Sequence, residues 1–201
     1  MSELRADLKA IVDLIAPSSS VLDIGCGDGE LLAWLTHYKL VEGRGIEIDT
    51  ANVNKAIAAG VPVIQGDIET DLAFYPDRAF DVVVLSQTLQ AMRDPKSVLA
   101  ELLRIGKTAI VSVPNFGHWK NRLYLAFKGR MPVTNTLSHQ WFDTPNIHFC
   151  TISDFVVLCE DMRIHIERRI WVDAEGVPSR FSGRGTLANL LGEQGIFLLS
   201  R

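Results

Sequence analysis

The sequence has few cysteines and no long hydrophobic run, and both absences narrow its possible environment. Only three cysteines occur in 201 residues, and none has zinc-ligand spacing to another cysteine or to a histidine. We therefore expect neither a disulfide framework nor a metal site. No apolar stretch approaches the ~20 residues that span a bilayer, and acidic residues close to Met1 do not suit a signal peptide. These features predict a cytoplasmic protein that has no membrane partner.

The chain also lacks a strong charge of either sign. Its formal net charge is −4 at pH 7, from 20 Lys and Arg against 24 Asp and Glu. Nucleic-acid-binding domains usually carry a basic surplus, so no nucleic-acid partner is expected. The length of 201 residues and the hydrophobic content of 47% suit one domain with a substantial core. We therefore predict a single domain over residues 1–201.

Short apolar runs alternate with amphipathic segments along the chain. The predicted strands are 20–24, 44–48, 61–65, 80–85, 108–113, 164–172 and 196–199. The predicted helices are 3–15, 30–38, 50–59, 94–104, 115–130 and 151–161. The run over 82–85 is apolar at every position, which is typical of a strand covered on both faces. The pattern predicts an α/β fold with a doubly wound, mostly parallel, seven-stranded sheet.

A glycine-rich loop, 23–29, follows the first predicted strand. Open parallel sheets bind ligands at the carboxyl ends of their strands, and glycines let the backbone turn tightly and approach a ligand. The glycine spacing is GxGxG, and Glu30 stands where a dinucleotide-binding loop has its third glycine. Acidic side chains here would repel a pyrophosphate but suit a ligand with an ammonium group, such as S-adenosylmethionine. Asp23 would accept a hydrogen bond from that ammonium group, directly or through water.

Two further strand ends carry acidic residues. Glu47 ends the second strand, where a carboxylate can accept from both hydroxyls of a nucleoside ribose. Asp67 follows the third strand, where it can accept from an adenine amino group while the backbone of Ile68 meets the ring edge. Acids at three successive strand ends favour S-adenosylmethionine or its demethylated product as the ligand. The alternative is an ordinary sheet of this class with surface acids in its loops.

These motifs carry a resemblance to a known superfamily. The segments VLDIGCGDG, GIEID and QGDIE resemble the cofactor motifs of class I S-adenosylmethionine-dependent methyltransferases, and the match covers about 18–114. Residues 80–95 resemble the fourth-strand region of that superfamily, which implies that Gln87 lies beside the cofactor. The expected cofactor-binding residues are Asp23, Gly25, Cys26, Gly27, Glu47, Ile48, Asp67, Ile68 and Gln87. Cys26 itself is interpreted as a small filler of the loop and not as a nucleophile.

The rest of the chain resembles a narrower family. Residues 112–151 are similar to the MetW proteins of bacterial methionine biosynthesis, and this resemblance extends along nearly the whole chain. MetW proteins accompany a homoserine O-acyltransferase of the α/β-hydrolase type, so the resemblance implies an activating partner of that enzyme. The alternative is an active methyltransferase that acts on a small acidic metabolite. The sequence Leu85-Ser86-Gln87-Thr88 lacks the segment that amino-methylating enzymes use, so a DNA or protein amine substrate is not expected.

A segment at about 115–150 is expected to cover the mouth of the cofactor site. No acidic residue occurs from Leu102 to Phe142, whereas six lysines and arginines do, which suits an acidic substrate or partner or, alternatively, a solvated helix face. His118 and His148 are the candidate general bases, although packing and hydrogen bonding within the segment is the preferred interpretation. The aromatic residues of the segment favour an interface.

Overall fold

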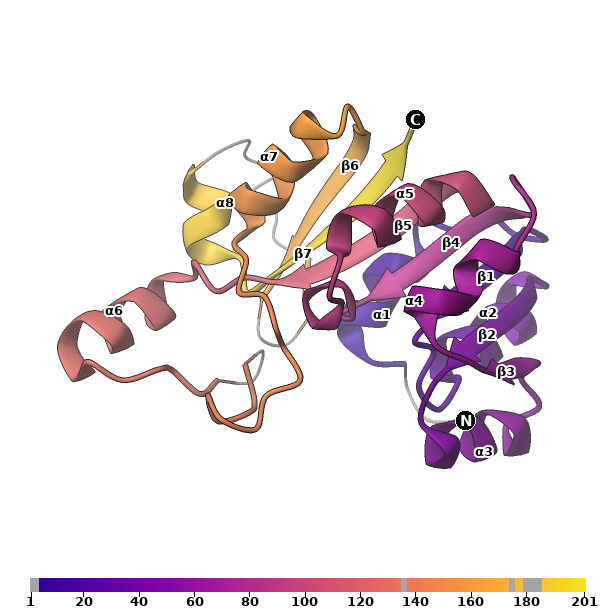
Figure 1. Cartoon of the computed structure of the whole chain (residues 1–201), viewed down its shortest axis with the longest axis horizontal. Helices are drawn as coiled ribbons and strands as arrows, with labels where there is room; N and C mark the ends of the chain where they lie inside the picture. Colours follow the sequence, from indigo (N-terminus) through magenta and orange to yellow (C-terminus); the bar gives the residue numbers. More distant parts are fainter. Residues whose placement is uncertain (1–3, 135–136, 174–175, 179–185) are drawn as a thin grey trace.

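The computed structural model describes residues 4–134, 137–173, 176–178 and 186–201. Within these residues, seven strands form one sheet in the order β3-β2-β1-β4-β5-β7-β6 (Figure 1). The strands are β1 (Ser20–Ile24), β2 (Glu42–Glu47), β3 (Val63–Gln65), β4 (Phe80–Ser86), β5 (Gly106–Pro114), β6 (His165–Val172) and β7 (Gln194–Ser200). β1 to β5 pair in parallel, whereas β7 runs antiparallel to both β5 and β6. The predicted mostly parallel, seven-stranded sheet is confirmed.

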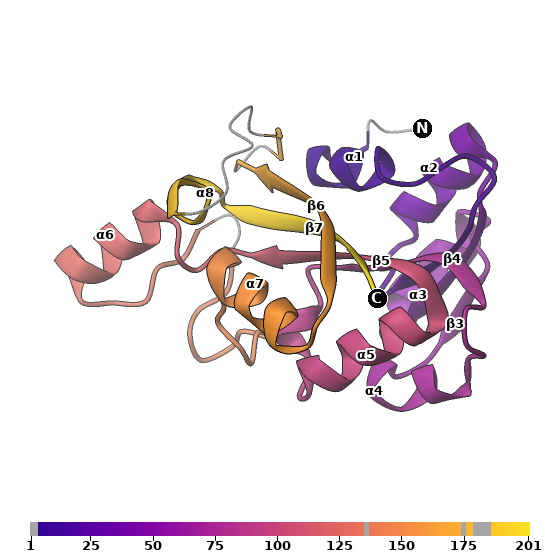
Figure 2. The ribbon, with the colours of Figure 1, turned by 90° about the horizontal axis from the view of Figure 1, so that it is seen from above.

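Helices cover both faces of the sheet (Figure 2). α1 (Ala6–Val12), α2 (Glu30–Lys39) and α3 (Thr50–Ala58) contribute to the core on one face, and α4 (Ile68–Asp71), α5 (Pro95–Ile105) and α7 (Ile152–Asp161) to the core on the other. The remaining helices are α6 (Trp119–Lys128) and α8 (Thr186–Leu191), with two 3-10 turns, η1 (Leu72–Phe74) and η2 (Leu89–Ala91). No helix in the described part of the chain is both long and apolar enough to cross a membrane.

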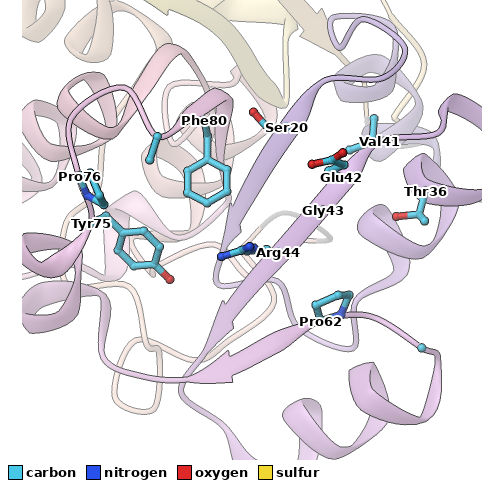
Figure 3. Close-up of a pocket in the computed structure, with 12 residues that line it drawn as sticks. Ser20, Thr36, Val41, Glu42, Gly43, Arg44, Pro62, Tyr75, Pro76 and Phe80 are labelled. Carbon is cyan, nitrogen blue, oxygen red and sulfur yellow. The ribbon is translucent and has the colours of Figure 1, made fainter.

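The amino ends of the central strands border an open cavity of about 800 Å³. Its wall includes Ser20 at the start of β1, Arg44 in β2 and Phe80 at the start of β4. Figure 3 shows the Arg44 side chain beside Tyr75 and Phe80 in this cavity. Because the glycine-rich loop follows the carboxyl end of β1, this cavity lies at the opposite edge of the sheet and belongs to a different surface.

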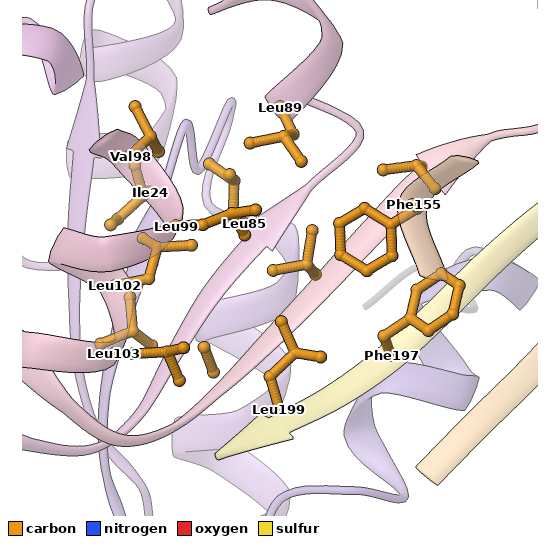
Figure 4. Close-up of a cluster of buried hydrophobic side chains, with 14 of the residues drawn as sticks. Ile24, Leu85, Leu89, Val98, Leu99, Leu102, Leu103, Phe155, Phe197 and Leu199 are labelled. Carbon is orange, nitrogen blue, oxygen red and sulfur yellow. The ribbon is translucent and has the colours of Figure 1, made fainter. Parts of the chain in front are cut away.

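Alternate residues of β4 face the two cores, which explains why this strand is apolar at every central position. Val83 and Leu85 pack with α5 and α7, whereas Val82 and Val84 pack with α1 and α2. Figure 4 shows the first of these cores, where Phe155 of α7 lies beside the β7 residue Phe197 with ring centroids 4.4 Å apart. A strand covered on both faces cannot alternate between apolar and polar residues, so its uniform run follows from the architecture.

The predicted helices 3–15 and 115–130 are shorter in the structure. α1 ends at Val12, and the residues after it form tight turns in which the amide of Ile15 donates to the Val12 carbonyl. α6 begins only at Trp119, because the chain just before it makes tertiary bonds. There, Asn115 Nδ2 donates to the carbonyls of Asn189 and Gly192, at 2.8 and 2.6 Å. α4, α8 and the two 3-10 turns were not predicted from the sequence.

Candidate functional site

A cavity of about 250 Å³ lies at the carboxyl ends of β1 and β4, beneath α1. It is lined by Arg5, Leu8, Asp23, Gly25, Cys26, Gly27, Asp28, Glu30, Leu31, Ser86 and Gln87. The structure therefore brings five of the nine sequence-derived cofactor residues to one cavity: Asp23, Gly25, Cys26, Gly27 and Gln87. The other four lie at or just after the carboxyl ends of the neighbouring strands: Glu47 and Ile48 at β2, and Asp67 and Ile68 at β3.

The glycine-rich loop needs glycine at three positions. Gly25, Gly27 and Gly29 have φ angles of 70°, 57° and 80°, a left-handed conformation that strains any residue with a Cβ. The amides of Gly25 and Cys26 both donate to the Ile46 carbonyl, at 2.8 and 3.1 Å, so the loop is fixed to the end of β2. A Cβ on Gly27 would meet no atom within 4 Å, so the backbone there borders open space that a ligand can occupy.

Asp23 is a buried acid that no described residue neutralises. Its side chain lines the cavity, the residue is 3% exposed, and no described residue donates a hydrogen bond to its carboxylate. Burial first, and then the negative charge of Glu47, raise the pKa of Asp23 from 3.8 to about 7. A cation entering the cavity would favour the ionised form, so this carboxylate is suited to a ligand that carries a positive charge.

The Glu47 carboxylate accepts from three backbone amides, one of which belongs to the glycine-rich loop. Its Oε2 accepts from the Gly27 amide at 2.8 Å, and its Oε1 accepts from the amides of Ile48 and Asp49 at 3.0 and 2.9 Å. The residue is 7% exposed, so these bonds compensate for the burial of a charged group. Each carboxylate oxygen has two lone pairs, and Oε2 accepts only from the Gly27 amide among the described residues.

Cys26 fills a gap between the loop and the sheet, as its small size suggested. A Cβ on Gly45 in β2 would lie 2.5 Å from Cys26 Sγ, so only glycine at that position leaves room for the thiol. Burial first, and then the charges of Asp23 and Glu47, raise the pKa of the thiol to about 12. The thiolate is the nucleophilic form, so a pKa this high disfavours it at neutral pH. Of the other cysteines, Cys159 is buried, whereas Cys150 is only partly buried.

The residues that follow β2 and β3 differ in their exposure to solvent. Asp67 is exposed and begins α4, where its carboxylate accepts from the Glu69 amide at 2.9 Å. Ile68 is buried in the core, but Ile48 at the end of β2 is 62% exposed. The exposed aliphatic side chain of Ile48, directly after Glu47, is suited to contact the face of a flat ring.

Two further residues line the cavity that no sequence motif marks: Leu8 in α1 and Arg5, the residue just before this helix. The helix is linked to the end of β4, because Gln87 Nε2 donates to Asp7 Oδ2 at 3.1 Å. Gln87 has a φ of 51°, and its amide donates to Ser112 Oγ at 3.0 Å. No local signal marks Arg5 and Leu8, because their place at the cavity depends on where α1 packs.

Neither candidate histidine lines this cavity. His118 is 5% exposed and precedes α6, and burial lowers its pKa. His148 is exposed, and its backbone amide donates to the Gln90 carbonyl at 2.9 Å. A general-base role for either residue stays a prediction.

Near the cavity, the described part of the 115–150 segment bonds to η2 but does not line the cavity. Among its described residues, none lines the 250 Å³ cavity. The amides of Ile147 and His148 both donate to the Gln90 carbonyl at 2.9 Å, and Gln90 Nε2 donates to the Gln87 carbonyl at 2.6 Å. A chain of hydrogen bonds therefore joins this segment to Gln87 at the cavity wall. In the part of the chain that the structure describes, no cluster of three or more His, Cys, Asp or Glu could hold a metal ion.

Comparisons with known proteins agree on the fold and on a family. A family model described as "Methionine biosynthesis protein MetW" matches residues 5–199. The bifunctional methionine biosynthesis protein MetXA/MetW of Rhodopirellula baltica is 33% identical over 181 residues, which are 86% of this chain and 29% of that protein. The chain thus spans less than a third of that relative and less than two thirds of the curated methyltransferases that it also matches.

Two solved structures show the same architecture. A SAM-dependent methyltransferase of Thermotoga maritima is 19% identical with a TM-score of 0.67, covering 97% of this chain and 87% of its own. The cyclase SpnF is 18% identical with a TM-score of 0.66, covering 98% of this chain and 81% of its own. The likeness at these identities is one of fold, and the fold is that of the class I SAM-dependent methyltransferases.

Proposed function

The chain belongs to the MetW family of methionine biosynthesis proteins, and on this premise we propose that it binds S-adenosylmethionine or S-adenosylhomocysteine and activates a homoserine O-acyltransferase. The observation that carries the ligand proposal is the buried Asp23 carboxylate, which lines a cavity and has no described hydrogen-bond donor. A ligand ammonium group supplies the missing partner. The proposed place of this activity is the cytoplasm, where the three thiols stay reduced.

The cavity and its surroundings fit this cofactor residue by residue. Asp23 accepts from the ammonium group of the amino-acid part, and the open space over Gly27 admits the chain that leads to the sugar. Glu47 accepts from a ribose hydroxyl at the position that its backbone partners leave free. Ile48 covers one face of the adenine, while Asp67 and the backbone of Ile68 meet its edge. When bound, S-adenosylmethionine offers a methyl group on a sulfonium, and S-adenosylhomocysteine offers none.

The partner proposal rests on the relative in which MetXA and MetW form one chain. This chain aligns with 29% of that relative, which leaves more than two thirds of its length for the MetXA part. A covalent link between two parts raises their effective concentration to roughly millimolar, which favours two parts that work in contact. An acyltransferase of the MetX type is therefore the proposed partner, with this chain as the activating subunit.

Cofactor occupancy is proposed to tune that contact. Gln87 lines the cavity, and Gln90 joins Gln87 to the amides of Ile147 and His148 in the 115–150 segment. A ligand that fixes Gln87 would also restrict this segment. The cofactor would then change the affinity for the acyltransferase by some factor. Thermodynamic linkage requires that the acyltransferase change the affinity for the cofactor by the same factor.

Methyl transfer to a small acidic metabolite is the second candidate function. It is favoured by Arg5, a cation at the wall of the cavity that pairs with Asp7 at 3.1 Å and can also face a substrate carboxylate. The fold itself does not decide between the two, since a cyclase and a methyltransferase share it. An enzyme of this kind converts S-adenosylmethionine to S-adenosylhomocysteine with metabolite extracts, with His118 or His148 as the candidate base. Tight cofactor binding without such turnover would contradict this second candidate.

A titration of the acyltransferase with this protein tests the favoured function. Acyl transfer to homoserine is measured at increasing concentrations of the protein, without cofactor and with saturating S-adenosylmethionine or S-adenosylhomocysteine. We expect the rate to rise to a plateau, at a concentration that shifts when cofactor is present. An unchanged rate together with no complex in analytical ultracentrifugation would refute the partnership. If a complex forms with the same affinity in the presence and absence of cofactor, only the proposed effect of the cofactor on that contact is refuted.

A further inference from the structure

Helix α6 is almost uncovered by the rest of the protein. It extends away from the sheet in both views of the molecule (Figures 1 and 2). Of its ten residues, only Asn121 is buried. Isolated helices shorter than about 12–15 residues are marginal in water, and helices in proteins gain most of their stability from packing of an apolar face. A helix of this length with an apolar face is therefore expected to pack against something.

The exposed surface of α6 carries a continuous apolar stripe. Trp119, Leu123 and Phe127 are spaced four residues apart, which places them on one side of the helix. Their exposed fractions are 40%, 45% and 81%, so the stripe becomes more open toward the far end of the helix. This arrangement has the spacing with which a helix enters an apolar groove of another protein.

The near end of α6 is fixed to the body of the protein, which holds the stripe in one direction. Asn121 Nδ2 donates to the carbonyls of Asn115 and Phe116, both at 3.3 Å. Arg122 Nε donates to the Gly117 carbonyl. Because the turn before α6 is bonded in this way, a partner would not have to order the helix before it binds, which lowers the entropy cost of association.

The far end of α6 is basic. Lys120 forms an ion pair with Glu193 at 3.4 Å, but Lys128 and Arg130 have no ion-pair partner among the residues that the structure describes. No acidic residue lies between Leu102 and Phe142, although the chain as a whole carries a formal charge of −4. Two free cations beside the most exposed part of the stripe select a partner whose groove has an acidic rim.

We propose that the α6 stripe is the surface by which this chain holds the acyltransferase, with Phe127 as an anchor in an apolar groove and Lys128 and Arg130 against acidic residues at its rim. This inference rests on the partnership proposed above. The occupant is the acyltransferase because a relative carries a MetXA part in the same chain as its MetW part, so the two are kept together. A second copy of this chain is the competing occupant.

Four single variants test the surface, two on α6 and two matched controls. Phe127→Ala removes the anchor, and Phe74→Ala removes a similarly exposed phenylalanine from η1, with exposed fractions of 81% and 84%. Lys128→Glu reverses a charge on α6, and Lys96→Glu reverses an exposed charge on α5. All four side chains are exposed, so folding and cofactor affinity should be unchanged, and both are measured as checks.

The readout is the dissociation constant of the complex with the full-length acyltransferase. We expect Phe127→Ala to weaken binding about 30-fold or more, as truncation of an interface anchor does. Lys128→Glu should weaken binding about tenfold at low salt and less at high salt, because exposed charges are screened. Phe74→Ala and Lys96→Glu should bind like the wild type.

Three outcomes would overturn the proposal, and they can be told apart. If the wild type does not bind the acyltransferase, the proposed function fails and this surface fails with it. If the wild type binds and both α6 variants bind equally well, the function stands and the surface is elsewhere. If the wild type is a dimer in analytical ultracentrifugation that Phe127→Ala converts to a monomer, with acyltransferase binding unchanged, α6 is covered by a second copy.

Discussion

Replacing Asp23 by asparagine isolates the charge of the site, because the two side chains have nearly the same shape. In the folded protein the pKa of Asp23 is about 7, against an ordinary value of 3.8, owing first to burial and then to Glu47. In the unfolded chain the carboxyl is solvated and keeps its ordinary value. The pKa of Asp23 therefore differs by about three units between the folded and unfolded states, and each unit corresponds to roughly 1.4 kcal/mol. The ionised carboxylate thus destabilises the folded protein by about 4 kcal/mol.

This cost appears over a defined range of pH. A pKa raised on folding means that the folded state holds the proton more tightly, so stability is greatest below about pH 4 and falls as the pH rises to about 7. Asparagine stays neutral throughout. Asp23→Asn should therefore be more stable than the wild type by about 4 kcal/mol at pH 8, and by less than about 1 kcal/mol at pH 4. Urea unfolding without ligand, followed by circular dichroism at both pH values, measures the difference.

The same substitution should weaken cofactor binding while it stabilises the fold. A hydrogen bond to a charged group is worth roughly 1.5–3 kcal/mol, so Asp23→Asn should bind S-adenosylmethionine about 10- to 100-fold more weakly at pH 8. Wild-type affinity should rise about tenfold from pH 6 to pH 8 as Asp23 ionises. The variant should lack that rise. Isothermal titration calorimetry over this range tests both statements.

Asp28→Asn is the control, because Asp28 belongs to the same loop but is exposed. It should change stability by less than about 0.5 kcal/mol. The reasoning would be refuted if Asp23→Asn were less stable than the wild type at pH 8. It would be refuted equally if the variant and the wild type differed in stability by the same amount at pH 4 and pH 8. Such a difference would come from side-chain shape, which does not depend on pH, and not from the charge of Asp23.

Three further substitutions test the site and the hydrophobic core. Glu47→Ala removes the acceptor of three backbone amides and should cost about 2 kcal/mol in urea unfolding, together with weaker cofactor binding in calorimetry. Gly45→Ala places a Cβ 2.5 Å from Cys26 Sγ and should lower the free energy of unfolding by about 1–3 kcal/mol. Adding Cys26→Ala should restore much of this loss, which thermal unfolding of the single and double variants measures. Phe155→Ala leaves a cavity against Phe197 and should cost about 3–5 kcal/mol in urea unfolding, without a change in cofactor affinity of the folded protein.

The strands were predictable from local patterns, continuous apolar runs in β4 and β5 and alternation in β6, but their ends depend on neighbours. β3 was expected from Val61 and begins at Val63, because Pro62 has no amide to donate and its carbonyl instead accepts from Gly45. β5 was expected over 108–113 and runs from Gly106 to Pro114, because it pairs with β4 on one side and β7 on the other. Pairing partners distant in the sequence decide where a strand stops.

The candidate site was predictable only in part, for a similar reason. The loop and the strand-end acids are marked by glycine spacing and by residue type, and the structure brings Asp23 and Gln87 to the same cavity. Arg5 and Leu8 line that cavity as well, yet nothing in the residues around them marks a site. Their contribution comes from the packing of α1, and from the bond between Asp7 and Gln87, which lie 80 residues apart.

The sequence by itself determined the order of the strands and the longer helices, the loop whose turns require glycine and the acids at the strand ends. These follow from backbone preference and apolar pattern, which are properties of a few adjacent residues. Only the tertiary structure decided that Asp23 titrates near pH 7, that Glu47 is held by the Gly27 amide and that α6 stands uncovered. Burial, hydrogen-bond partners and exposure depend on residues far apart in the chain, so only the folded arrangement can set them.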